Sequence, residues 1–354
     1  MRSVLFALLL SASLAGAQEI PVAQAVPRST VYFTLEPNVI RGASINRTIV
    51  QRMVDSLVVA ATQKPTPAQA WASLVTPKDV VGVKVSTGGG ATSGTHPEVV
   101  EAIVNGLLAA GVPPSRIIVW DKNYGDLIAA GFKPDAANYR LRWIDAAKGY
   151  DPDAVLTAPV LGKLIWGDSK FGRRDLSRKV DLLSGGDQLS SQSFYARVLS
   201  KEVTKVINVP SLQDSFLTGV NGALASMTIQ NIDNWRRFTR EPMFGDPYVA
   251  EIYADPIIYD KVVLTFLDAL YLQFAGGPFP NPNFAVPYHS IFVSRDPVAI
   301  DATARRLIDE QRLLNKLPAL KEQTLYLESA QQMGLGNDED AQINLVRIGV
   351  EGFR

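Results

Sequence analysis

The stretch between residues 79 and 121 constrains the fold more than any other part of the sequence. It opens with a strand-length run rich in β-branched residues, 80–85, and continues into a loop of small residues, 86–94, that contains four glycines. The apolar spacing of residues 97–108 then predicts a helix, and residues 116–121 predict the next strand. A strand–loop–helix–strand unit predicts a right-handed crossover and a parallel sheet.

The rest of the chain continues this alternation of strands and helices. Strands are predicted at 31–34, 139–144, 203–212, 261–268, 289–294 and 343–350, and helices at 46–61, 66–74, 124–130, 218–232 and 296–312. The order predicts an α/β fold with an open, mostly parallel sheet flanked by helices in Rossmann-like βαβ units. We expect 31–34 to be an edge strand. Residues 148–204 are less regular, and we expect an insertion or a small antiparallel piece there.

The first 17 residues have the features of an export signal. Arg2 supplies the positive charge, residues 4–10 form a short apolar run, and Ala15-Gly16-Ala17 resembles a cleavage site. The apolar run is too short to span a bilayer. Because no paired arginines precede it, we expect general secretory export to the periplasm or the extracellular space. Residues 18–74 are expected to form an N-terminal extension that packs on an α/β domain of residues 75–354.

Composition excludes several classes of protein. Because 35 basic residues balance 35 acidic ones, we expect no nucleic-acid partner and no stable membrane insertion. The absence of cysteine excludes disulfides, cysteine nucleophiles and cysteine-ligated iron–sulfur clusters. With two histidines, the chain cannot form a three-histidine metal site alone, so a bound metal would be a hard, oxygen-ligated cation such as calcium or magnesium. The oligomeric state stays open.

Several segments resemble a known family in their order and spacing. They are residues 79–84, 95–103, 117–121, 208–210 with Asp214, 218–224, 295–302 and 334–336. Over roughly residues 75 to 350 the chain resembles the bacterial and archaeal family called domain of unknown function 362. The family is named for lacking an assigned activity, so the resemblance implies little about chemistry.

The sequence departs from this family at two places. The family typically shows Lys-Asp-His after the Asn-Val-Pro strand and Lys-Asn after Gly-Ala-Leu, whereas residues 213–215 here are Gln-Asp-Ser and residues 225–226 are Ala-Ser. These differences remove two lysines and one histidine from the site that the resemblance implies. Many members also carry a ferredoxin-like cluster module, which a chain without cysteine cannot hold.

The glycine-rich loop is the predicted ligand site. Free backbone N–H groups and a helix dipole meet there, and open α/β sheets bind ligands at the carboxyl ends of their strands. The alternative is a flexible connection that ends in an ordinary helix cap at Thr95 or His96. The predicted ligand-binding residues are Ser86, Thr87, Gly88, Gly89, Thr95, Asn208, Asn221 and Asp268.

Four residues are candidates for catalysis: Lys84, His96, Asp121 and Asp214. Lys84 lies in an apolar strand, so we expect it to pair with Asp121 and orient a carboxylate or phosphate; the alternative is an edge strand whose lysine reaches water. Asp121 and Asp268 each end a predicted strand, and with Asp214 they could share a crevice suited to acid–base chemistry or a hard metal. The alternative for each aspartate is a helix or turn cap. His96 is predicted to cap the helix, and its side chain either also faces this site or serves only as a cap.

Two functions fit these features. The first is an exported enzyme that acts on a small anionic molecule, with Lys84 and the loop binding it and Asp121, Asp214 or His96 moving protons. The second is a non-catalytic protein, ligand-binding or structural, that has lost the reactive groups of its family. The first is favoured by analogy with other proteins of this fold class.

Overall fold

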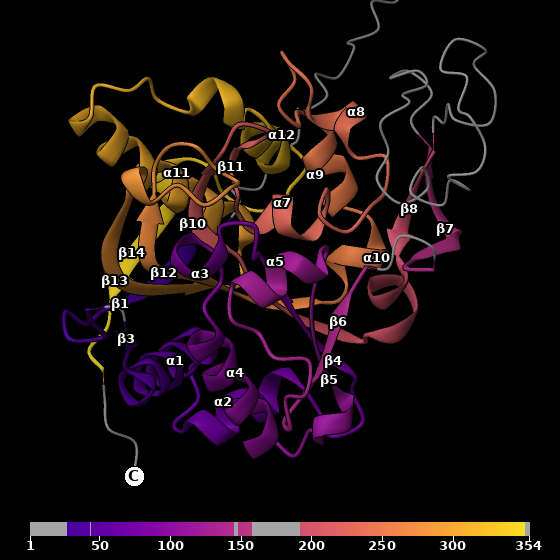
Figure 1. Cartoon of the computed structure of the whole chain (residues 1–354), viewed down its shortest axis with the longest axis vertical. Coiled ribbons are helices and arrows are strands. Elements are labelled where there is room, and N and C mark those ends of the chain that lie inside the picture. The colour runs from indigo at the N-terminus through magenta and orange to yellow at the C-terminus, as the bar shows by residue number, and fades with distance from the viewer. Residues whose placement is uncertain (1–26, 43, 145–147, 158–191, 351–354) are drawn as a thin grey trace, which may run out of the picture.

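The computed structural model describes residues 27–42, 44–144, 148–157 and 192–350 (Figure 1). The predicted export signal lies outside these residues, as does the central part of the irregular segment. None of the described helices is long and apolar enough to cross a membrane.

A mixed, mostly parallel sheet forms the centre of the fold, as predicted. Its strands follow the order β14 (Ile343–Arg347), β1 (Ser29–Leu35), β13 (Ala285–Ser294), β12 (Val262–Gln273), β9 (Lys205–Val209), β4 (Val81–Val85), β5 (Ile117–Asp121) and β6 (Arg140–Trp143). The strands from β12 to β6 are mutually parallel, and β13 is antiparallel to both of its neighbours. Two short strands, β10 (Ser211–Ser215) and β11 (Gly219–Val220), branch from β12.

The predicted strand–loop–helix–strand unit is present within this sheet, beside its β6 edge strand. β4 leads through a short helix in the loop, α3 (Gly90–Ser93), into α4 (Pro97–Ala109), and the chain returns through η1 (Pro114–Arg116) to β5. β4 and β5 then pair in parallel from Val81 opposite Ile117 to Lys84 opposite Trp120. Pro97 occupies the first helical position, where its missing N–H leaves no hydrogen bond unmade.

Helices cover both faces of the sheet (Figure 1). One face packs against α1 (Arg47–Thr62), α2 (Pro67–Leu74) and α4, and the other against α7 (Ala223–Met227), α9 (Tyr248–Tyr253) and α12 (Tyr326–Gln332). Strand alternation divides the side chains between them, because Val119 packs in the first core and Trp120 in the second. A third apolar cluster joins α11 (Pro297–Leu314) to β10, β12 and β13. Asn46, Thr66 and Asp296 cap α1, α2 and α11.

The remaining elements are short. They are β2 (Ile40–Arg41), β3 (Ser44–Ile45), α5 (Tyr124–Ala129), β7 (Tyr150–Thr157), β8 (Gln192–Ala196), η3 (Val198–Glu202), α8 (Arg236–Thr239), α10 (Pro256–Tyr259), η4 (Pro282–Phe284), η5 (Lys321–Thr324) and η6 (Asp340–Gln342). β7 and β8 form the small antiparallel piece expected within residues 148–204.

Three sequence predictions were wrong. β1 is not an edge strand, because β14 pairs with its outer side. β12 continues past Asp268 to Gln273, because its second half finds partners in β10 and β13, so Asp268 lies within a strand and not at its end. Of the helix predicted at 218–232, only α7 forms, because residues 219–220 pair with β10 and Asn231 bonds to backbone carbonyls.

Two helical glycines test how closely α4 packs on α2. A Cβ at Gly106 would overlap the buried indole of Trp71, whereas a Cβ at Gly125 in α5 would meet no atom within 4 Å. Gly106→Ala should lower the free energy of unfolding by about 1–3 kcal/mol through overpacking. Gly125→Ala is the matched control, and its helix propensity should stabilise the protein by at most about 1 kcal/mol. Urea unfolding measures both, and equal effects would contradict the packing.

Candidate functional site

A buried ion pair joins the carboxyl ends of the neighbouring strands β4 and β5. The Lys84 ammonium, which is 0 % exposed, donates to Asp121 Oδ1 at 2.8 Å. It also donates to the Val85 carbonyl at 2.6 Å and to Gln230 Oε1 at 2.9 Å, so all three of its hydrogens are used. Burial lowers the pKa of Lys84, and the charge of Asp121 opposes that shift. The predicted pairing is therefore present, and β4 is an interior strand, so an edge lysine that reaches water is excluded.

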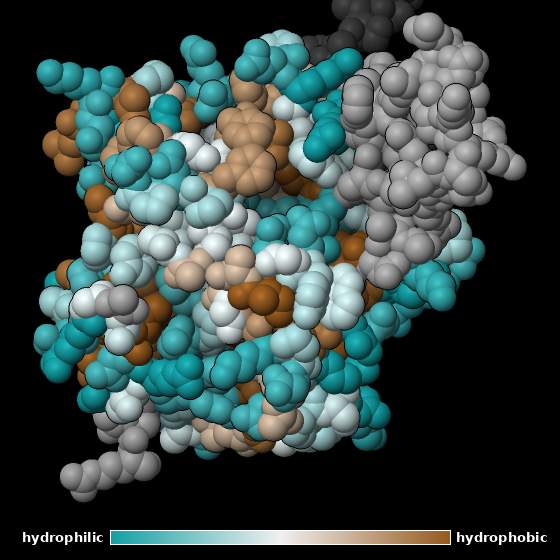
Figure 2. Space-filling view, viewed as in Figure 1, coloured by the Kyte–Doolittle hydropathy of each residue, from teal (hydrophilic) through white to brown (hydrophobic). Residues whose placement is uncertain are grey.

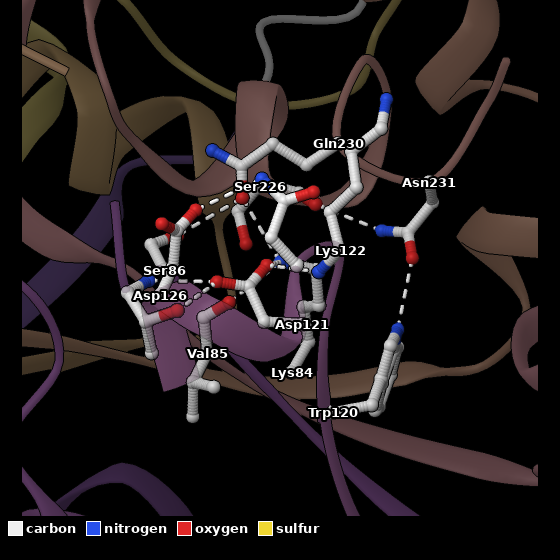
Figure 3. A network of polar contacts seen from close by, with 12 residues as sticks. Lys84, Val85, Ser86, Trp120, Asp121, Lys122, Asp126, Ser226, Gln230 and Asn231 are labelled. Carbon is white, nitrogen blue, oxygen red and sulfur yellow. Dashed lines mark hydrogen bonds and ion pairs between the residues drawn. The ribbon is translucent and has the colours of Figure 1, made fainter. Parts of the chain in front are cut away.

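Asp121 holds the glycine-rich loop from the inside (Figure 3). Its Oδ2 accepts the Thr87 backbone N–H at 2.7 Å and the Thr87 hydroxyl at 2.6 Å. Its Oδ1 accepts the Lys122 backbone N–H at 2.7 Å in addition to the Lys84 ammonium. Two donors on each oxygen fill the acceptor positions of the carboxylate, so Asp121 organises the loop and has no lone pair left for proton transfer.

The loop is also bonded to itself. The Ser86 N–H donates to the Thr95 hydroxyl at 2.9 Å, and that hydroxyl donates to the Val209 carbonyl of β9 at 2.6 Å. A Cβ at Gly89 would lie 2.5 Å from the Ser93 backbone carbon, so this glycine permits the loop to fold back on itself. Gly88 instead borders a cavity.

This β4–β5 cavity has a volume of about 580 Å³ and opens at the carboxyl ends of β4 and β5. Its charged lining residues are Asp121, Lys122, Asp126, Arg236 and Arg240, and its aromatic ones are Phe216, Trp235 and Phe279. Figure 2 shows apolar side chains gathered in the upper middle of a largely hydrophilic face, near the position of β11 in Figure 1.

Cations surround the aromatic ring of Trp235 in this cavity. Lys122 Nζ lies 5.3 Å from the ring centroid, and the Arg236 guanidinium carbon lies 5.2 Å from it. Such contacts are favourable cation–π interactions. Arg240 follows Arg236 by four residues and lines the same cavity. The cavity thus combines an aromatic surface with three cations, and one of its two acidic groups is already paired with Lys84.

A row of side-chain amides runs from the ion pair along the cavity. Gln230 accepts from Lys84 and donates to Asn221 Oδ1 at 2.7 Å. Asn221 donates to Gln213 Oε1 at 3.1 Å, and Gln213 donates to the Phe279 carbonyl at 3.2 Å. The predicted residue Asn221 is therefore positioned by neighbours on both sides. Figure 3 shows Gln230 above the Lys84–Asp121 pair and Asn231 bonded to Trp120.

His96 and Asp268 form a second buried pair that shares no hydrogen-bond partner with Asp121. Asp268 Oδ2 lies 2.9 Å from His96 Nδ1 and also accepts the His96 backbone N–H at 2.7 Å. Burial opposes a charge on the ring, but the Asp268 carboxylate outweighs it and raises the pKa of His96 above 6.5. His96 lines a different cavity, and the two cavities have no lining residue in common.

Asp214 and Asn208 make hydrogen bonds to neighbouring segments and do not meet in a shared crevice. Asp214 Oδ1 accepts the Gly277 N–H at 2.9 Å, and burial raises its pKa. Asn208 donates to the Ala223 carbonyl and accepts from the Ser226 hydroxyl. Within the described residues, no group of three or more histidine, aspartate or glutamate side chains is placed to hold a metal ion. The three aspartates expected to meet are therefore held by separate partners.

The sequence analysis missed several cavity residues, namely Lys122, Phe216, Gln230, Trp235, Arg236, Arg240 and Phe279. A signal for part of this set is present, since Trp235 is followed at once by two arginines and Arg240 lies one helical turn beyond Arg236. The sequence alone does not show that these residues reach the strand ends, because tertiary contacts bring them there. Phe279 reaches the site only through the fold, from the loop that precedes β13.

Comparison with known proteins identifies the family. The model of the family "Domain of unknown function (DUF362)" matches residues 81–306, more than half of the chain. The chain belongs to the DUF362 family. No curated protein matches it. A structural-genomics crystal structure of a Thermotoga maritima protein is similar at 13% identity and a TM-score of 0.38, over 78% of this chain and 61% of that one. The chain thus spans less than two thirds of that protein.

Removing the Lys84 ammonium tests whether the ion pair supports the fold. Lys84→Met leaves the buried Asp121 carboxylate without its charge partner, which should cost about 3–5 kcal/mol of unfolding free energy. Lys78→Met, at an exposed position, should change it by no more than about 0.5 kcal/mol. The double variant Lys84→Met/Asp121→Asn should be more stable than Lys84→Met alone. Urea unfolding decides the question, and a Lys84→Met protein as stable as wild type would contradict a supporting pair.

The His96–Asp268 pair predicts a defined pH dependence. Because the folded-state pKa of His96 is raised above 6.5, its contribution to stability is fully present below pH 6.5 and is lost as pH rises through the raised value. The stability difference between wild type and His96→Gln should therefore be largest in mild acid and shrink as pH rises. Urea unfolding across this pH range measures it. A difference that grows with pH would show that the ring is held neutral.

Proposed function

We propose that this DUF362 protein binds a small organic anion in the β4–β5 cavity. The observation that carries the proposal is the set of three cations in one cavity at the carboxyl ends of parallel strands: Lys122 and Arg236 lie against Trp235, and Arg240 lines the same cavity. Ligands of open α/β sheets bind at this edge. Guanidinium groups match the geometry of carboxylate and phosphate oxygens.

The lining also favours a ligand with a flat apolar part. Phe216 and Phe279 have ring centroids 6.1 Å apart, and their side chains are 55% and 62% exposed. Trp235 adds a third aromatic ring to the same cavity. Aromatic rings of this kind stack on planar groups and gain from their burial. An aryl or heterocyclic phosphate or carboxylate fits both the charge and the aromatic surface.

A ligand-binding function without catalysis is better supported than the enzymatic function that the sequence favoured. Internal hydrogen bonds use all three hydrogens of Lys84 and fill the acceptor positions of Asp121. General acid–base catalysis needs a group within hydrogen-bond reach of the substrate proton. At a position where the family resemblance implies a lysine, Gln213 instead joins the row of amides.

We also propose that the protein is exported, which would place this ligand outside the cytoplasm. The charge, the apolar run and the small residues in the first 17 positions support this proposal. N-terminal sequencing of the protein from its own host tests it. A mature chain that begins at Gln18 is expected, and an uncleaved cytoplasmic chain would contradict it.

Calorimetric titration with 1-naphthyl phosphate and with inorganic phosphate tests the ligand site. The naphthyl ester should bind at least about tenfold more tightly, because its ring adds roughly 1.4 kcal/mol or more. Arg236→Gln and Arg240→Gln should each weaken binding by about tenfold, which is the loss of one charge-assisted contact.

Arg52→Gln is the matched control, because Arg52 is exposed and does not line the cavity. Equal binding by wild type and both cavity variants would reject the site. Equal affinity for the two phosphates would reject the aromatic part of the ligand and leave the anion site standing.

A further inference from the structure

A second cavity, the α4 groove, has a volume of about 830 Å³. It is lined by α4 from Pro97 to Asn105 and by residues from the segments 44–47 and 130–139. His96 precedes α4 and lines this groove. Because the α4 groove shares no lining residue with the β4–β5 cavity, a ligand bound in one need not contact the other.

The His96 ring is held by Asp268 through one nitrogen, and its other nitrogen has no partner. Asp268 Oδ2 accepts the His96 backbone N–H, so the carboxylate acts as an acceptor and Nδ1 is the donor in the contact between them. The ring stacks on Tyr271 at 5.7 Å between centroids. Nε2 is buried and has no hydrogen-bond partner among the described residues, while the His96 side chain is only 4 % exposed.

Leaving a buried polar atom without a hydrogen-bond partner is energetically unfavourable. We therefore expect Nε2 to bond to an atom that the described residues do not supply. Burial opposes a charge on the ring, but Asp268 outweighs it and raises the pKa of His96, with smaller contributions from Glu98 and the Thr92 backbone. The Thr92 contact falls short of a hydrogen bond, since Nε2 has no partner. In the charged ring Nε2 carries a hydrogen, and its missing partner is an acceptor.

The charges around the groove allow an anion to enter. Arg47 bridges Glu98 at 3.6 Å and Glu101 at 3.2 Å, which offsets part of their negative charge. Lys133 and Asp135 also line the groove, and the positive end of the 13-residue helix α4 lies at His96. The carboxylates that oppose an anion are Asp268 at the ring and Glu98, Glu101 and Asp135 in the lining. Glu98 is the lining carboxylate whose charge acts on the ring.

We propose that the α4 groove is a second ligand site, in which the His96 Nε2–H donates to an oxygen of a small carboxylate or phosphate. Asp268 is the positioning residue, because it fixes the ring and sets its charge. This proposal does not rest on the β4–β5 cavity, and either site can fail without the other.

The two histidines of the chain make a direct test possible. The full chain labelled with ¹³Cε1-histidine gives one ring signal from His96 and one from His289. His289→Asn assigns them, because asparagine tolerates the positive φ of 59° at that position. Sodium acetate and inorganic phosphate are the probes, each titrated at constant ionic strength at several pH values.

Saturable acetate binding should shift the His96 signal and leave the His289 signal in place. Because the carboxylate binds the charged ring, acetate should raise the measured pKa of His96 by about one unit, equivalent to tenfold tighter binding to the imidazolium. Asp268→Asn should lower the pKa of His96 and weaken acetate binding. A response to phosphate but not to acetate would assign the site to phosphoryl groups.

Charge variants separate an anion site from a cation site. Glu98→Gln removes the opposing carboxylate and should tighten acetate binding several-fold, whereas Glu251→Gln, at an exposed position outside the groove, should not. No saturable His96 shift with either probe at concentrations on the order of 0.1 M would overturn the proposal. Weaker acetate binding in Glu98→Gln would also overturn it, because it would show that the groove selects positive charge.

Discussion

The Lys84–Asp121 ion pair is the contact on which the rest of the site depends. It lies between adjacent interior strands, where an unpaired charge of either sign would be strongly destabilising. The lysine also holds Gln230, and the aspartate also holds Thr87, so one pair fixes segments that are 143 residues apart. Gly82 supports the same arrangement, because a Cβ there would overlap the Trp120 ring. The pair therefore fixes the carboxyl ends of β4 and β5, which form one side of the β4–β5 cavity.

The proposed function rests on the other groups that line the β4–β5 cavity. Lys84 and Asp121 are committed to internal hydrogen bonds. The cations of the cavity are Lys122, directly after β5, and Arg236 and Arg240, and its aromatic rings are Trp235, Phe216 and Phe279. These residues lie on short helices and turns, where side chains can change without disturbing the sheet.

The sequence predicted the central unit well because its signals are local. β4, α4 and β5 are specified by neighbouring residues, and a lysine in a buried strand needs an acid on the next strand, which leaves Asp121 as its partner. The position of β1 and the length of β12 depend on pairing with distant strands, which local periodicity does not report. Asp121, Asp214 and Asp268 were expected to share a crevice, but each has separate partners. The cavity cations were missed because tertiary contacts bring them to the strand ends.

The most direct test of the account is a crystal structure of the protein with 1-naphthyl phosphate. The account predicts the phosphoryl group beside Arg236 and Arg240 and the naphthyl ring against Trp235, above an unchanged Lys84–Asp121 pair. A ligand bound elsewhere, or one that breaks the ion pair to contact Lys84, would contradict the central claim. That claim is that the Lys84–Asp121 pair supports the cavity structurally and does not react with the ligand.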